Sequence, residues 1–74
     1  MPMFWTMINE DTGEAFDMNT ERLTISGNVG RIVGFRPPVD DRDTGVIYIV
    51  YDGTTTPIEL VPSEVNITLR EIVS

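Results

Sequence analysis

The stretch Val46-Ile47-Tyr48-Ile49-Val50-Tyr51 contains only β-branched and aromatic residues, the side chains that fit best on a pleated sheet. An apolar run without polar alternation is typical of a strand covered on both faces, or on one face and at an interface. The stretch therefore predicts a central strand. Asp52-Gly53 follows directly and predicts a turn.

The strands on either side of this stretch are weaker but regularly spaced. Arg31 to Arg36 predicts a strand in which Gly34 favours a bulge or bend, and Pro37-Pro38 ends it because proline donates no ladder hydrogen bond. A short strand is expected at 23–25, and residues 26–30 are expected to interrupt the strand pattern after it. On the C-terminal side the pattern predicts a strand at 57–61, a helical turn at 62–65 and a last strand at 66–72 that offers Ile67, Leu69 and Ile72 to the core.

The N-terminal segment predicts a hairpin, with a strand at 4–8, a turn at 9–13 and a returning arm at 14–18. The chain then contains about six or seven strands and no helix of ordinary length, which is an all-β pattern. We expect one domain over residues 1–74, with an N-terminal hairpin or arm at 1–21 and a small barrel at 22–74. Deletion of residues 1–18 would then leave a soluble barrel and abolish association.

Length and composition limit how the fold is stabilised. A chain of 74 residues buries a modest core, and this one has no cysteine and no histidine, so disulfides and the usual zinc sites are excluded. Reinforcement must come from packing or from a partner, which predicts a homo-oligomer or a part of a larger assembly.

The charge is strongly acidic, with twelve Asp and Glu residues against five arginines, no lysine and a net charge of −7. This field disfavours direct binding to nucleic acid and favours protein partners, including those with a basic surface. No apolar run is long enough to span a membrane, and Met1-Pro2-Met3-Phe4-Trp5 lacks the basic region of a signal peptide. We therefore expect a cytoplasmic or virion location and no membrane partner.

The order of these elements over Arg22 to Ile72 resembles an SH3-like barrel. Three features carry the resemblance: a Gly30-to-Phe35 strand that enters a long acidic loop, a central strand that ends in Tyr51-Asp52-Gly53, and Pro62-Ser63-Glu64-Val65 before a last strand. The resemblance implies a small barrel of about five strands with the N-terminal hairpin added to it. It does not select a function, because small barrels of this kind serve many.

Catalysis finds little support in the residue inventory. Without His, Cys or Lys the common pairs of nucleophile and base are missing. Asp11-Thr12-Gly13 and Asp43-Thr44-Gly45 each spell the aspartic-protease triplet, but both lie in polar surroundings and predict turns. We therefore expect no catalytic residue and no enzyme.

One enzymatic alternative comes from a second resemblance, to the type II dihydrofolate reductases, which are tetramers of a small SH3-like barrel. Residues 30–35 are similar to that family's glycine-bearing strand, and residues 58–62 fall where its Val-Gln-Ile-Tyr-Pro motif would lie. Glu59 and Val61 replace the motif's glutamine and tyrosine. An acidic pore would repel the anionic ligands folate and NADPH.

Metal binding is considered for the loop Asp40-Asp41-Arg42-Asp43-Thr44-Gly45, whose alternating oxygen ligands and glycine would suit calcium. The loop does not match the EF-hand pattern, and a solvated loop is favoured. We expect no metal site and no cofactor.

Candidate interaction residues are the aromatic and arginine side chains that a small core cannot all absorb. Phe4 and Trp5 are adjacent, so in a strand they point to opposite faces, and only one can readily enter the core. The other would anchor a neighbouring subunit. Phe16, Phe35 and one tyrosine are expected in the core, and the full candidate set is Phe4, Trp5, Arg31, Arg36, Tyr48 and Tyr51.

Three classes of function remain open. The first is a non-enzymatic assembly module, for example a decoration or connector protein of a bacteriophage virion, with residues 3–9 and 46–51 as its interface. The second is a small phage- or plasmid-encoded inhibitor or adaptor that binds a host protein or sequesters a ligand. The third is a subunit of a type II dihydrofolate reductase-like enzyme.

Overall fold

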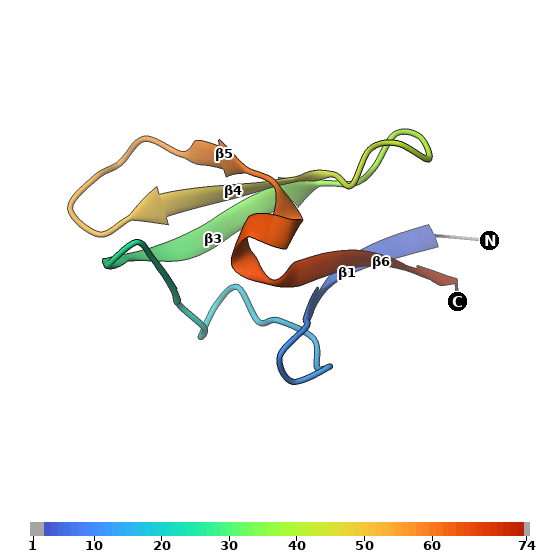
Figure 1. Ribbon diagram of the computed structural model, residues 1–74, viewed down its shortest axis with the longest axis horizontal. Coiled ribbons are helices and arrows are strands. Elements are labelled where there is room, and N and C mark those ends of the chain that lie inside the picture. Colours follow the sequence, from blue (N-terminus) through green and yellow to red (C-terminus); the bar gives the residue numbers. More distant parts are fainter. Residues whose placement is uncertain (1–2, 74) are drawn as a thin grey trace.

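The computed structural model describes residues 3–73, which form six strands and one short 3-10 turn (Figure 1). The all-β prediction is confirmed for this part of the chain. The bounds are β1 (Met3–Asn9), β2 (Leu23–Ile25), β3 (Asn28–Arg36), β4 (Val46–Tyr51), β5 (Ile58–Leu60), η1 (Pro62–Val65) and β6 (Ile67–Val73).

Four strands form an antiparallel sheet in the order β2-β3-β4-β5, so β4 lies inside the sheet as predicted. The register of β3 against β4 shifts between Ile32 and Gly34, which confirms the bulge expected at this glycine. The break expected at 26–30 is present but shorter than predicted. Only Ser26 and Gly27 form the turn, with φ of 51° and 83°, and β3 already begins at Asn28 because this two-residue turn suffices to reverse the chain.

The remaining two strands, β1 and β6, form a separate antiparallel sheet, here called the ribbon, with register from Met3↔Val73 to Asn9↔Ile67. The predicted hairpin at 4–18 is therefore wrong, because its returning arm is reduced to a single bridge between Ile8 and Ala15. The Asp17 carboxylate accepts a hydrogen bond from the Asn19 N–H, an Asx turn that ends the extended stretch after Phe16. β6 instead supplies a full-length partner.

The core lies between the two sheets, and the N-terminal segment is part of it. Buried side chains come from both sheets and from the loop after β1: Met7, Phe16, Ile32, Ile47, Ile49, Ile67 and Leu69. Trp5, Phe35 and Tyr51 pack against them. The division into residues 1–21 and 22–74 stays a prediction, but β1 is no free arm, since it pairs along its whole length with the last strand.

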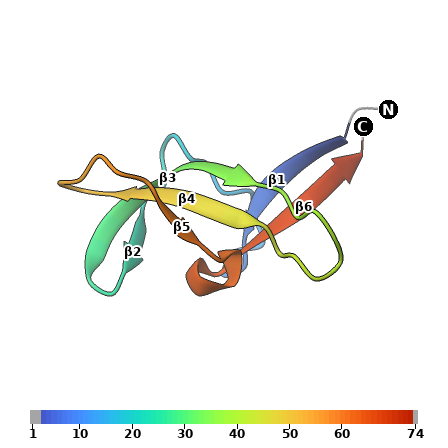
Figure 2. The same cartoon turned by 90° about the horizontal axis from the view of Figure 1, so that it is seen from above.

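The two sheets are not closed into a barrel by hydrogen bonds, and the molecule is elongated, with extents of 40 × 23 × 19 Å. Figure 1 and Figure 2 show the ribbon crossing one face of the four-stranded sheet and projecting beyond it, with the start of β1 beside the end of β6. The radius of gyration is 12.5 Å, against about 11 Å expected for a compact chain of this length. Over residues 3–73 no helix is long and apolar enough to cross a membrane.

Candidate interaction surface

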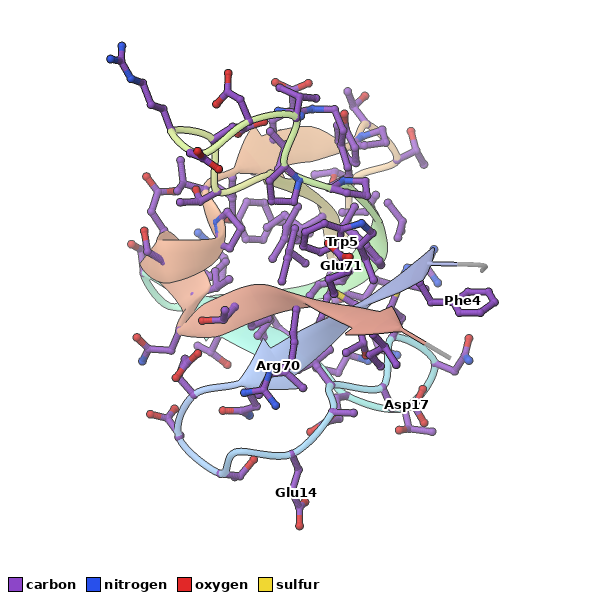
Figure 3. All side chains as sticks on the ribbon, turned by 90° about the vertical axis from the view of Figure 1, so that its right-hand side faces the viewer. Phe4, Trp5, Glu14, Asp17, Arg70 and Glu71 are labelled. Carbon is purple, nitrogen blue, oxygen red and sulfur yellow. The ribbon has the colours of Figure 1, made fainter. Side chains whose placement is uncertain are left out.

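The projecting end of the ribbon carries an exposed apolar pair. Phe4 and Ile72 lie directly opposite each other across β1 and β6, so their side chains share one face, and they are 56% and 45% exposed. In Figure 3 Phe4 points away from the rest of the molecule. The expectation that Ile72 enters the core is wrong, because its strand position has the opposite parity to Ile67 and Leu69, which are buried.

The other face of the ribbon carries Trp5, which is half-buried and packs against the core. Trp5 lies opposite Glu71, and both lie on the side that faces the β3–β4 loop (Figure 3). The expectation that only one of the two adjacent aromatic residues enters the core is confirmed. Phe4 is left as the exposed member of the pair.

A predominantly apolar groove of about 350 Å³ lies between the ribbon, η1 and the β3–β4 loop. Its walls combine a tryptophan, two prolines and two core-facing residues of β6, and its lining residues are Trp5, Pro38, Asp43, Thr44, Pro62, Ser63, Ile67, Thr68 and Leu69. The sequence signals for Pro38 and Pro62 were those of strand and turn boundaries. Only the fold brings these two prolines beside Trp5.

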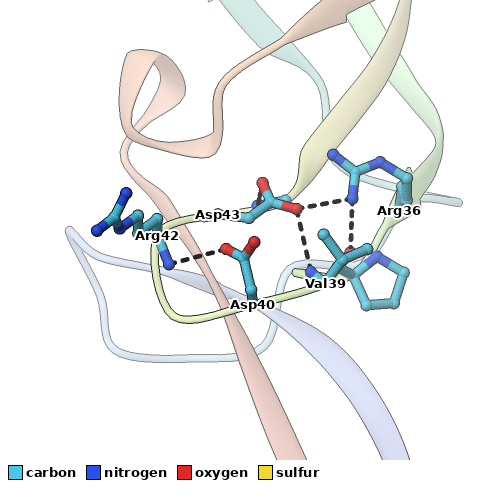
Figure 4. A network of polar contacts seen from close by, with 7 residues as sticks. Arg36, Val39, Asp40, Arg42 and Asp43 are labelled. Atoms are coloured by element: carbon cyan, nitrogen blue, oxygen red, sulfur yellow. Dashed lines mark hydrogen bonds and ion pairs between the residues drawn. The ribbon is translucent and has the colours of Figure 1, made fainter.

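One ion pair fixes the loop that forms a wall of this groove (Figure 4). The Arg36 guanidinium donates to Asp43 Oδ2 at 2.8 Å and to the Pro37 carbonyl oxygen at 3.0 Å. Asp43 also accepts hydrogen bonds from the N–H groups of Val39 and Gly45, at 3.0 and 2.9 Å. Arg36, a predicted interaction residue, therefore pairs with a carboxylate of its own chain.

These contacts shift the pKa values of both partners. The hydrogen bond from Arg36, followed by those from Gly45 and Val39, lowers the pKa of Asp43 from 3.8 to about 2. The hydrogen bond to Asp43 in turn raises the pKa of Arg36. The loop is therefore held by a carboxylate that stays charged in mildly acidic solution.

Acid is expected to weaken this arrangement in a defined window. Because the folded-state pKa of Asp43 lies below its unfolded value, the stabilisation is present above about pH 4 and is lost as the pH falls towards 2. The difference in urea midpoint between wild type and Asp43→Asn should therefore shrink across this window. Asp41→Asn, which removes an exposed carboxylate of the same loop, should leave the wild-type acid dependence in place. An unchanged acid dependence in Asp43→Asn would contradict this assignment.

The calcium alternative for the same loop finds no support in its geometry. Both oxygens of Asp43 accept hydrogen bonds, and Asp40 accepts one from the Arg42 N–H at 2.9 Å. Within residues 3–73 no group of three or more acidic side chains could hold a metal ion. The expectation of a solvated loop stays the simpler interpretation.

The remaining candidates lie elsewhere. Tyr48 and Arg31 lie on the outer face of the four-stranded sheet, and Tyr51 packs against the core from the inner face. The six predicted interaction residues therefore do not form one site: Phe4 lies at the tip of the ribbon, Trp5 and Arg36 near the groove, and the other three along the sheet.

The residues considered for enzymatic roles also lie apart. Asp11 lies in the loop after β1, where its N–H donates to Asn9 Oδ1, and Gly13 has a φ of 75°, so this triplet forms a turn as predicted. The second triplet ends at Gly45, also with positive φ. Glu59 lies opposite Tyr48 in the four-stranded sheet, and Val61 is exposed.

No family model, no curated protein and no solved structure matches this chain.

Proposed function

We propose that this chain is a non-enzymatic protein-interaction module that assembles with copies of itself through the projecting ribbon. The observation that supports it is the exposed cross-strand pair Phe4 and Ile72 on a two-stranded sheet. Single exposed apolar residues are ordinary, but two that lie side by side at the projecting end of a sheet form a small apolar patch that gains from being covered.

The area of the molecule points the same way. The chain exposes 5126 Å², against roughly 4,600 Å² expected for a monomeric protein of this mass. The excess fits a projecting element that is not covered within one copy. Contact through the ribbon would cover this element without any change of fold.

Mutation of the apolar pair tests the proposal. Wild type should show a mass above the 8.3 kDa of one chain as concentration rises, measured by light scattering after size exclusion. The double variant Phe4→Ser, Ile72→Ser should stay monomeric. Val39→Ser is the matched control, because Val39 is 76% exposed in the β3–β4 loop and does not belong to the ribbon. A monomeric wild type at every concentration would refute self-assembly.

Salt provides a second criterion. Copies that each carry a charge of −7 repel one another, so apolar association should strengthen as ionic strength rises. Weaker association at high salt would instead indicate an electrostatic contact.

A finer fold assignment accompanies this proposal. We infer that the two sheets are a small SH3-like barrel whose gaps are filled by side chains. The inference is supported by the 3-10 turn between β5 and β6, the bulge in β3 and the packing of the ribbon across the larger sheet.

A second candidate function is an acidic inhibitor or adaptor for a basic protein. Residues 10–21 favour it, because they hold five carboxylates and no basic residue: Glu10, Asp11, Glu14, Asp17 and Glu21. Binding of this kind would weaken steeply with salt. The opposite salt dependence separates it from self-assembly.

A further inference from the structure

The outer edge of β6 is open to another strand. β1 donates and accepts at its other edge through Met7 and Asn9, which bond to Phe16 and Glu14. In an antiparallel pair, successive residues point their backbone N–H and C=O groups to opposite edges of the strand. The even-numbered residues of β1 therefore point these groups towards β6. Given the register, Leu69 and Glu71 then point their N–H and C=O groups away from β1. No other strand of the described chain pairs there.

The apolar groove lies along this same edge. Three consecutive residues of β6, Ile67 to Leu69, line it together with Pro62 and Ser63 of η1. A strand added beside β6 would place every second side chain on the face that Leu69 and Glu71 share. Those side chains would enter the groove beside Ile67 and Leu69, where the walls are apolar.

The next residue of β6 on this face after Ile67 and Leu69 is the charged residue Glu71. Glu71 is exposed, and the two ion pairs of the described residues, Arg22–Asp52 and Arg36–Asp43, do not include it. The chain as a whole carries a charge of −7. A basic side chain two residues beyond the apolar ones would meet an unpaired carboxylate in an acidic field.

We propose that the free edge of β6 accepts an extended segment of another protein, with apolar residues at two alternating positions and an Arg or Lys at the next. Main-chain hydrogen bonds to Leu69 and Glu71 would hold the segment, and the groove and Glu71 would select its side chains. This surface is distinct from the apolar tip of the ribbon, so the proposal does not depend on self-assembly.

Peptide titration tests it, with Trp5 as reporter, because Trp5 lines the groove and is the one tryptophan of the chain. The probes are acetylated peptides of the form Thr-Φ-Thr-Φ-Thr-X-Thr, where Φ is Val or Leu and X is Arg or Glu. We expect the Arg peptides to shift Trp5 fluorescence with roughly five- to tenfold tighter binding than the Glu peptides. Glu71→Arg should reverse this preference.

Two controls separate strand addition from loose apolar contact. N-methylation of the peptide residues whose N–H groups donate to β6 should abolish binding. N-methylation of the alternate residues, whose N–H groups point away from β6, should leave binding intact. By NMR, the amide protons of Leu69 and Glu71 should become protected from exchange on binding, whereas those of Thr68 and Arg70 should be protected already.

Two outcomes would overturn the proposal. The first is no fluorescence change and no new protection at Leu69 and Glu71 with any of the peptides at millimolar concentration. The second is protection of the same two amides on raising the concentration of the protein alone, which would assign the edge to a second copy. The peptides should bind equally to Phe4→Ser, Ile72→Ser, so failure here and failure of self-assembly are distinguishable.

Discussion

Replacement of Gly45 by alanine is expected to destabilise the fold by roughly 2–4 kcal/mol. Gly45 has a φ of 87°, which an L side chain adopts only with strain. A Cβ there would lie 2.5 Å from Leu69 Cδ1 and 2.7 Å from the Arg36 carbonyl oxygen. The leucine can move, but the carbonyl belongs to a strand and cannot. Urea unfolding followed by Trp5 fluorescence measures the loss.

Gly53 provides the matched control. Its φ is 86°, almost the same, but an added Cβ would meet nothing within 4 Å. Gly53→Ala should therefore cost only the backbone strain, about 1–2 kcal/mol. Equal losses at the two positions would show that the close approach at Gly45 relaxes at no cost.

The strands could be predicted where the pattern is local. Residues 46–51 are β-branched or aromatic throughout, and their strand has the bounds that the pattern indicated. Pro62 fixed the position of the 3-10 turn by its restricted φ. The pairing of β1 with β6 could not be read in this way, because it joins the two ends of the chain and no local signal specifies a partner.

The candidate surface was predictable only in part. The adjacency of Phe4 and Trp5 was enough to indicate that one of them stays outside the core. Ile72 was missed as its partner, since the two meet only through the register of the ribbon. The alternation of side chains along β6 was enough to predict that Ile72 is exposed. Ile67 and Leu69 lie on the buried face, and Ile72 lies on the opposite face.

Removal of residues 1–18 is expected to unfold the chain. The deletion takes away β1, the partner of β6, and two of the buried core side chains, Met7 and Phe16. Truncation of either residue to alanine alone costs about 2–5 kcal/mol, and a domain of this size rarely has more than about 3–5 kcal/mol available. The fragment 19–74 should show a disordered far-ultraviolet dichroism spectrum and narrow amide dispersion by NMR.

Addition of the missing segment in trans distinguishes a structural strand from a detachable arm. A synthetic peptide of residues 1–18 should restore dispersed amide signals to the fragment, because the contacts it makes are the ladder with β6 and the core packing of Met7 and Phe16. The same peptide with Phe16→Ala should fail, whereas Phe4→Ser should succeed, since Phe4 is exposed and lies outside the core. A fragment 19–74 that folds alone would show that β1 is dispensable, and that the core between β6 and the larger sheet closes without it.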